Sequence, residues 1–243
     1  MAPACIPDSF AFISQERSIM KRKTVIFDND GVLFRTETVD ITAINKALVL
    51  HGLEEESPEF IMDCFGMTLE EMCEKRFGIT DPVAMKKFME DVTRFEQAEI
   101  AQSGLMYEGA PEFIKRLKKK GFAICICSNG SYDYVHGIMS KFGLLKVFDE
   151  IWAHKDGYSK LQAVACLAEK YSDGCFVMVG DRSIDIDAGR DSGAITIGTL
   201  YGFGGKEPYS ADYTAGSIAE LEQVIYRIFE NEFDVKESQL CAE

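Results

Sequence analysis

The sequence predicts an α/β fold, a doubly wound parallel sheet with an inserted α-helical domain. Five short apolar segments alternate with amphipathic helical patterns along most of the 243-residue chain. This alternation is typical of a parallel sheet that carries helices on both faces. One stretch, residues 36–107, contains helical patterns and no strand pattern. We therefore expect a helical insertion after the first strand of the sheet.

The predicted strands are short and rich in apolar residues, which suits inner strands of a parallel sheet. They cover Thr24–Phe27, Ala123–Cys127, Glu150–Ala153, Phe176–Val179 and Ala194–Ile197. The helical patterns between and after them cover Pro111–Lys120, Tyr132–Phe142, Leu161–Lys170 and Ile218–Phe229. Proline in the first turn and glycine directly after the end mark the first of these helices.

Four further helices are predicted in the insertion. They cover Asp40–His51, Pro58–Phe65, Thr68–Phe77 and Asp81–Ser103. Thr68 and Glu71 have the spacing of a capping box, and the methionine and phenylalanine stripe from Met85 to Phe95 predicts a helix-bundle core. The predicted organisation is an N-terminal extension at 1–20, an α/β core at 21–35 and 108–230, a helical domain at 36–107, and a polar, frayed tail at 231–243.

Composition and charge indicate a soluble globular protein, with 47% hydrophobic and 27% charged residues. The formal net charge of −14 disfavours nucleic acid and anionic membranes as partners. The basic run at 115–120 ends a predicted helix, where it complements the helix dipole. The insertion carries 15 acidic and 6 basic residues, which we expect to form a solvated surface.

The N-terminal segment and the cysteines bear on localisation. The first twenty residues contain no long apolar run, so neither a signal peptide nor a transmembrane helix is expected there. The eight cysteines form no CxxC pair, and Cys125 and Cys127 alternate with isoleucines as core thiols would. A reduced, cytoplasmic protein is the simplest interpretation.

Acidic residues follow the first predicted strand directly. Asp28 and Asp30 stand at its carboxyl end, and Gly31 lets the backbone turn sharply there. Two carboxylates this close repel each other unless a cation or a shared proton compensates. The alternative interpretation is a helix N-cap followed by a turn aspartate.

Further polar residues stand at the ends of other strands, the edge where open parallel sheets bind ligands. Lys160 opens the helix that leads into the fourth strand, and Lys155 is a nearby alternative to it. The residues at the strand ends are Ser128, Asn129 and Gly130 after the second strand, and Asp181 and Asp185 after the fourth. Acids, a hydroxyl, backbone amides and a lysine are thus expected to converge on one edge.

These motifs resemble those of haloacid dehalogenase (HAD) superfamily phosphatases. TVIFDNDGVLF resembles the first family motif, ICICSNG the second, Lys160 the third and VMVGDRSID the fourth. Their order and the helical insertion are similar to the phosphoglycolate phosphatase-like branch with a small helical cap, which shares the loop at 201–204. The resemblance spans residues 21–229 and implies a HAD-like core with a cap domain at 36–107.

The resemblance implies a Mg²⁺-dependent phosphatase that acts on a small-molecule phosphate ester. Asp28 would attack phosphorus and form an aspartyl-phosphate, and Asp30 would protonate the leaving alcohol and then deprotonate water. Lys160 is implied as the third catalytic residue, because its charge keeps Asp28 ionised and binds phosphoryl oxygens. In many relatives this lysine is followed by proline, whereas Leu161 follows it here.

The resemblance also implies the ligands of the metal and of the phosphate. Mg²⁺ prefers oxygen ligands. The implied metal residues are Asp28 and Asp181 through their carboxylates, Asp30 through its carbonyl, and Asp185 through a supporting contact or water. The implied phosphate-binding groups are the Ser128 hydroxyl, the amides of Asn129 and Gly130, and Lys160.

Other functions stay open on the sequence alone. A sugar phosphomutase of the β-phosphoglucomutase kind uses the same first steps, although Met67 and its neighbours offer no cation for a second phosphate. A non-catalytic phosphate-binding or regulatory protein is a further alternative. Phosphoglycolate, a nucleoside monophosphate, a sugar phosphate and pyrophosphate are all candidate substrates. The oligomeric state, monomer or dimer, is also open.

Overall fold

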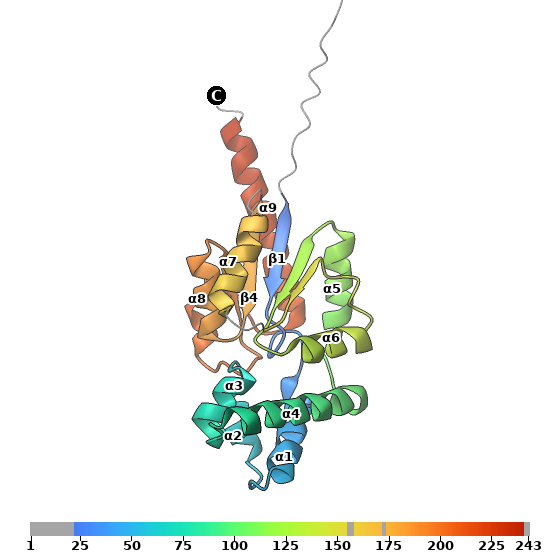
Figure 1. The fold of residues 1–243 in the computed structure, drawn as a ribbon. Coiled ribbons are helices and arrows are strands. Elements are labelled where there is room, and N and C mark those ends of the chain that lie inside the picture. The colour runs from blue at the N-terminus through green and yellow to red at the C-terminus, as the bar shows by residue number, and fades with distance from the viewer. Residues whose placement is uncertain (1–21, 155–157, 172–173, 241–243) are drawn as a thin grey trace, which may run out of the picture.

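The protein is described here by a computed structural model that covers residues 22–154, 158–171 and 174–240, with 231–240 as helical backbone (Figure 1). The predicted N-terminal extension, Lys155 and residues 241–243 lie outside the described residues. In Figure 1 a sheet flanked by helices occupies one end of the molecule, and helices α1 to α4 occupy the other.

The predicted parallel sheet is confirmed. In the described part of the chain six strands pair in the order β3-β2-β1-β4-β5-β6, and every pair is parallel. All five predicted strands are present, with ends shifted by at most two residues. The strands are β1 (Lys23–Phe27), β2 (Ala123–Cys127), β3 (Glu150–Trp152), β4 (Cys175–Gly180), β5 (Ile195–Thr199) and β6 (Tyr213–Ala215).

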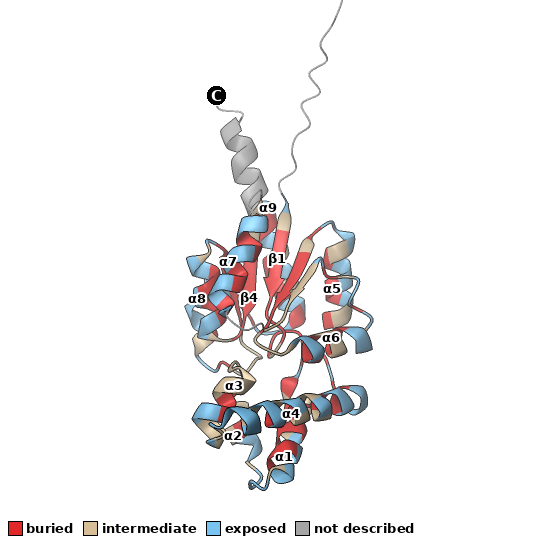
Figure 2. Ribbon diagram, viewed as in Figure 1, coloured by how far each residue is buried: buried red, intermediate tan, exposed pale blue. Residues whose placement is uncertain are grey.

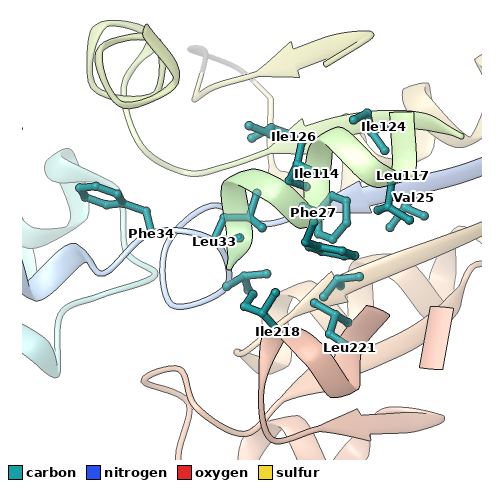
Figure 3. Packing of buried hydrophobic residues seen from close by; sticks show 14 of the residues in the cluster. Val25, Phe27, Leu33, Phe34, Ile114, Leu117, Ile124, Ile126, Ile218 and Leu221 are labelled. Atoms are coloured by element: carbon teal, nitrogen blue, oxygen red, sulfur yellow. The ribbon is translucent and has the colours of Figure 1, made fainter. Parts of the chain in front are cut away.

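Helices cover both faces of the sheet, and successive residues of β1 pack against opposite faces, as the pleat requires. Val25 and Phe27 belong to the cluster that includes helix residues Ile114 and Leu117 (Figure 3), whereas Ile26 packs with Val164. The covering helices are α5 (Ala110–Lys119), α6 (Tyr132–Lys141) and α9 (Ile218–Leu240) on one face, and α7 (Lys160–Lys170) and α8 (Ser183–Asp191) on the other. Figure 2 shows the strands as the buried centre.

The strand order reverses beside β1, which places a ligand-binding crevice at its carboxyl end. The chain runs outward from β1 through β2 to β3 and then returns to β4 on the other side of β1. Phe27 is in register with Ile126 of β2 and Val179 of β4. The residues that follow these three strands therefore emerge side by side.

The insertion forms helices that pack around a core of their own. Ile44, Ile61, Phe88 and Val92 are fully buried in this core. The elements are η1 (Thr36–Thr38), α1 (Asp40–Leu50), α2 (Pro58–Met62), α3 (Leu69–Met72), η2 (Cys73–Phe77), which is a π-helical turn, and α4 (Pro82–Gln102). The boundaries of a separate cap domain at 36–107 stay a prediction.

Local sequence explains where these helices begin. Asp81 caps α4 by accepting hydrogen bonds from the backbone N–H groups of Val83 at 3.1 Å and Ala84 at 2.9 Å. The predicted capping box is present, with Thr68 and Glu71 each accepting the other's backbone N–H, at 3.2 and 3.1 Å. The sequence predicts one regular helix over Thr68–Phe77, but in the structure its second half, Cys73–Phe77, is a π-helical turn.

Further departures from the sequence-based expectation concern β6, α8 and α9. Strand β6 was not predicted because it has only three residues and is partly exposed. Helix α8 was not predicted because its sequence, SIDIDAGRD, is poor in strong helix formers. Helix α9 does not end at Phe229 as predicted but continues to Leu240, through most of the segment expected to be a frayed tail.

The basic run at 115–120 lies at the end of α5, as predicted. Arg116 contacts Glu222 and Lys118 contacts Asp149, each at 2.6 Å. These intramolecular ion pairs explain part of the run without a nucleic-acid partner. Across the described ranges, no helix is long and apolar enough to cross a membrane.

Candidate active site

β1 ends in a tight turn that carries the first two acidic residues. Asp28 continues the sheet, with its backbone N–H donating to the Val179 carbonyl at 2.9 Å. The Asn29 carbonyl accepts three backbone N–H groups from later in the turn, one at 3.4 Å and two at 2.9 Å. Gly31 has a φ of 74°, a left-handed conformation that glycine adopts without strain. The turn thus fixes Asp28 and Asp30 at the carboxyl edge of the sheet.

Three predicted acids meet at this edge. Asp28, Asp181 and Asp185 each offer a carboxylate oxygen, and these oxygens lie within 4.8 Å of one another. Burial raises the pKa of Asp28 well above its usual value against the opposing charge of Lys160, and the neighbouring carboxylates add to the rise. Burial and the charge of Asp185 raise the pKa of Asp181 to about 7. A divalent cation would relieve this repulsion, and carboxylate oxygens are ligands that Mg²⁺ prefers.

Lys160 supplies positive charge to the same cluster. Its Nζ lies 2.6 Å from Oδ1 of Asp28 and 2.5 Å from Oδ1 of Asp185. Burial alone would lower the pKa of Lys160, but the charges of Asp185 and Asp28 raise it above its usual value. The lysine is the first residue of α7, and the capping box of Ser159 and Gln162 fixes that start. Lys160 is therefore a buried, charged partner of the acids.

Asp30 lies in a separate hydrogen-bond network. Its Oδ1 accepts from the Thr36 hydroxyl at 2.6 Å and the Tyr134 hydroxyl at 2.9 Å, and its Oδ2 accepts from the Ser128 hydroxyl at 3.2 Å. The sequence analysis missed Thr36 and Tyr134, because nothing in their local pattern distinguishes them from ordinary helix residues. Three hydroxyl donors orient this carboxyl group beside Asp28, where it can give or take a proton.

The residues after β2 make contacts within the site. The Ser128 Oγ accepts the backbone N–H of Gly130 at 2.9 Å. The Asn129 side chain donates to the Gly66 carbonyl of the insertion at 2.9 Å. The predicted phosphate-binding role of these residues stays a prediction, and the bond from Asn129 adds a role in attaching the insertion.

The loop at 201–204 positions Asp181. The Asp181 Oδ2 accepts backbone N–H groups from Phe203 at 2.5 Å and Gly204 at 3.1 Å. The sequence analysis noted this loop only as a resemblance and assigned it no role. Its glycines allow the backbone to approach the carboxylate closely.

The insertion covers the strand ends. The Arg182 guanidinium donates to the Phe65 carbonyl, and the Phe65 and Phe203 rings pack edge to face with centroids 4.8 Å apart. On the other side, the Gln97 side chain of α4 donates to the Asp133 carbonyl of α6 at 2.7 Å. The cavity between the two parts is lined by the acids, Lys160, the loop at 65–67, and residues of α1 and α4.

Two acids of the insertion, Asp40 and Glu96, line this cavity and are buried, with 8% and 4% exposure. The expectation of a solvated acidic surface is therefore wrong at these positions. Burial and the charges of Glu96 and Asp30 raise the pKa of Asp40 well above its usual value. Burial and the charge of Asp30 raise the pKa of Glu96 to about 8. Glu96 lies one turn beyond Val92 on the buried face of α4. This helical spacing could have predicted from the sequence that Glu96 is buried.

Replacing Gly180 by alanine should disrupt the acidic cluster. A β-carbon at Gly180 would overlap the β-carbon of Asp185. We expect the free energy of unfolding to fall by about 1–3 kcal/mol, the usual effect of overpacking, and stabilisation of the protein by Mg²⁺ to be lost. Denaturant unfolding with and without Mg²⁺ measures both. Gly52→Ala is the control: its positive φ of 74° strains alanine and lowers stability, but no atom lies near its β-position, so the response to Mg²⁺ should be unchanged. Retained Mg²⁺ stabilisation in Gly180→Ala would contradict the prediction.

Replacing Glu96 by glutamine should stabilise the protein in a pH-dependent way. Because the folded-state pKa of Glu96 is raised to about 8, wild-type stability is lost as pH rises from the unfolded pKa through this value. The neutral amide avoids that loss. We expect Glu96→Gln to gain at least about 2 kcal/mol over wild type between pH 5 and 9 in the free energy of unfolding. Glu90→Gln, on the exposed face of α4, should show no such trend, and parallel pH profiles for wild type and Glu96→Gln would contradict the argument.

The fold and site define a hydrolase of the haloacid dehalogenase type. The family model for haloacid dehalogenase-like hydrolases matches residues 25–199, a range that contains all of the predicted site residues. The chain belongs to this family, as the motif resemblance predicted.

Similar proteins are named phosphatases. The chain is 26% identical to the N-acetylmuramic acid 6-phosphate phosphatase of Pseudomonas aeruginosa, over 91% of this chain and 98% of that protein. It is 26% identical to the phosphoglycolate phosphatase of Vibrio parahaemolyticus, over 84% and 96% of the two chains. A solved structure of a predicted phosphoglycolate phosphatase from Haemophilus somnus superimposes with a TM-score of 0.73 at 20% identity, over 85% and 99% of the chains.

Proposed function

We propose that the protein is a Mg²⁺-dependent phosphatase that hydrolyses a small-molecule phosphate ester through an aspartyl-phosphate on Asp28. The observation that carries this proposal is the meeting of Asp28 with two further carboxylates and with Lys160, whose Nζ is 2.6 Å from the Asp28 carboxylate. The similar proteins are named phosphatases, which supports hydrolysis of a phosphate ester as the reaction class. They differ in substrate, so the substrate is argued separately below.

In the first step, one Asp28 carboxylate oxygen bonds to phosphorus while the bond from phosphorus to the ester oxygen breaks. Asp30 gives its proton to that oxygen, so a neutral alcohol leaves. Water then attacks the phosphoryl group and gives a proton to Asp30, which releases inorganic phosphate and restores Asp28. The hydroxyls of Thr36 and Tyr134, bonded to Asp30 at 2.6 and 2.9 Å, keep the carboxyl oriented in both steps.

The acidic cluster fits a magnesium ion. The carboxylates of Asp28 and Asp181 and the Asp30 carbonyl would hold it, and Asp185 would support it or bind it through water. When bound, the ion neutralises charge that develops on the phosphoryl oxygens. The fit is supported by the raised pKa of Asp181, about 7, which reflects burial next to another carboxylate.

Phosphoryl oxygens would be bound by Lys160, by the Ser128 hydroxyl and by the amides of Asn129 and Gly130. In the structure the Gly130 N–H is bonded to the Ser128 Oγ at 2.9 Å. Substrate would replace that internal bond. The insertion would act as a lid that excludes bulk water from the site, and a covered site favours small substrates.

We also infer a cytoplasmic location. Cys125 and Cys127 are buried, and burial raises the pKa of each thiol to about 12. Such thiols are inert core residues, and all six cysteines in the described part of the chain are free, which is usual in a reducing compartment.

Phosphate release from a panel of phosphomonoesters, with and without Mg²⁺, tests the proposed function. We expect release that needs Mg²⁺ and disappears after chelation. Assaying transfer of phosphate between sugar hydroxyls on the same samples separates a hydrolase from the phosphomutase alternative. Absence of release from every ester by folded protein with Mg²⁺ would contradict the proposal.

A further inference from the structure

Asp40 and Glu96 are buried acids that the proposed reaction does not use. Asp40 opens α1 and Glu96 lies in the middle of α4, and both line the cavity that holds Asp28 and Asp30. Oδ1 of Asp40 and Oε2 of Glu96 are buried and accept no hydrogen bond within the described part of the chain. A buried carboxyl oxygen without a partner is costly unless a ligand satisfies it.

The charges around this pair are negative. After burial, the charges of Glu96 and Asp30 do most to raise the pKa of Asp40, the Tyr134 hydroxyl opposes that rise, and Asp30 also raises the pKa of Glu96. The positive groups that line the cavity are engaged elsewhere. Lys160 contacts Asp28 and Asp185 at 2.6 and 2.5 Å.

Arg182, which also lines the cavity, is engaged as well, and the His154 ring of the same cavity lies 3.8 Å from the Glu70 carboxylate. Its Nε lies 3.1 Å from Oε1 of Glu207, and its Nη1 donates to the Phe65 carbonyl. Neither Lys160 nor Arg182 is therefore available to an anionic group bound near Asp40 and Glu96. An anionic group bound here would meet acidic side chains and no available cation. A bound ammonium would instead favour release of the protons that burial holds on Asp40 and Glu96.

A single metal ion does not suit this pair. Over the described ranges, the one group of three acids whose oxygens converge closely enough for an ion is Asp28, Asp181 and Asp185. Asp40 and Glu96 do not form such a group with Asp30. An ammonium group, which donates up to three hydrogen bonds in different directions, can satisfy oxygens that are spread further apart.

The pair lies on the leaving-group side of the reaction. Asp30 would protonate the leaving alcohol, and it lines the same cavity as Asp40 and Glu96. The Thr36 hydroxyl, which lines this cavity four residues before Asp40, donates to Asp30 at 2.6 Å. A group attached to that alcohol would thus reach Asp40 and Glu96, while the phosphoryl group stays at Asp28 and Lys160.

We propose that the substrate is a phosphomonoester whose alcohol carries a protonated amine, and that Asp40 and Glu96 bind this ammonium. This inference rests on the proposed function. The arrangement would select for a phosphorylated amino alcohol and against alcohols that carry a carboxylate or a second phosphate. The protein would then differ in specificity from its relative named for phosphoglycolate, an ester whose alcohol carries a carboxylate.

Matched esters test this inference. We would compare kcat/KM for aminoalkyl phosphates of two to four carbons with alkyl phosphates in which methyl replaces the amine, and with phosphoglycolate. We expect the best aminoalkyl ester to exceed its methyl counterpart at least tenfold, and phosphoglycolate to be the poorest. Equal or better turnover of the methyl or carboxylate esters would overturn the inference while leaving the proposed function intact. No release from any ester would contradict the proposed function itself.

Variants assign the effect to the two acids. In Asp40→Asn and Glu96→Gln, the preference for the aminoalkyl ester over its methyl counterpart should fall at least tenfold. The control Glu90→Gln makes the same change on α4 at a side chain that is 66% exposed, and it should keep the preference. An amine preference that survives in both Asp40→Asn and Glu96→Gln would overturn the assignment.

An inhibition experiment on the unaltered protein avoids any folding defect of the variants. Free amino alcohols should compete with an alkyl phosphate whose alkyl chain is uncharged, at concentrations at least tenfold below those of the matching diols. Equal inhibition by diols would overturn the inference in favour of hydroxyl recognition.

Discussion

Replacing Asp28 by asparagine is expected to lower kcat by at least about 10³-fold, because the amide cannot form the covalent phosphoryl intermediate. Asparagine keeps the size of the side chain, so KM should change far less than kcat. Phosphate release under saturating Mg²⁺ and substrate measures the effect. Residual activity within about tenfold of wild type would contradict the assignment of Asp28 as the nucleophile.

The same variant separates chemistry from folding. Asp28 is buried beside three other carboxyls, and burial with their charges raises its pKa against the opposing effect of Lys160. An acid with a raised folded pKa costs stability at pH values above its unfolded pKa. Without metal at neutral pH, Asp28→Asn should therefore unfold at a higher denaturant concentration than wild type. A less stable variant would indicate that the Lys160 ion pair outweighs the repulsion.

Replacing Lys160 by methionine is expected to have the largest effect on stability. The Lys160 side chain is 3% exposed and contacts both Asp28 and Asp185. Its removal leaves two buried carboxylates without a cation, a change that typically costs about 3–5 kcal/mol. The loss should appear in the free energy of unfolding at neutral pH without metal, and it should shrink at acidic pH as the carboxyls take up protons.

An exposed lysine is the control for this prediction. Lys75 contacts Glu71 at 2.6 Å, but its side chain is 58% exposed, and ion pairs at the surface contribute little. Lys75→Met should leave the denaturation midpoint nearly unchanged. A loss of similar size in both variants would show that the effect of Lys160→Met does not come from the buried carboxylates. Phosphatase activity should fall in Lys160→Met alone.

The sheet and its acidic edge could be predicted from the sequence because their signals are local. Thr24–Phe27 is an apolar run that ends in Asp28 and Asp30, and the same form recurs before Asp181. A parallel sheet brings its strand ends together whatever the connections contain. Lys160 was expected at this edge because it opens the helix that leads into the fourth strand, and the resemblance implied its role. Its contacts with Asp28 and Asp185 could not be predicted, because only the tertiary fold brings the start of α7 to both acids.

The side of the cavity that Thr36, Asp40 and Tyr134 line could not be predicted in the same way. Asp40 reads as a helix-starting acid that favours the dipole, and its burial depends on how α1 meets the rest of the molecule. Thr36 and Tyr134 are separated by about a hundred residues, and only the tertiary fold brings both hydroxyls to Asp30. The predicted roles of the site residues and the predicted domain boundaries stay open to experiment.

The attachment of the loop at 65–67 has a consequence for how such enzymes diversify. Asn129 and Arg182 hold this loop through the main-chain carbonyls of Gly66 and Phe65. Main-chain acceptors are present whatever side chains the loop carries. Met67, whose side chain lines the cavity, can therefore change during evolution without loss of these two bonds. A change at Met67 could therefore alter which substrate is preferred while the two main-chain bonds that attach the loop stay in place.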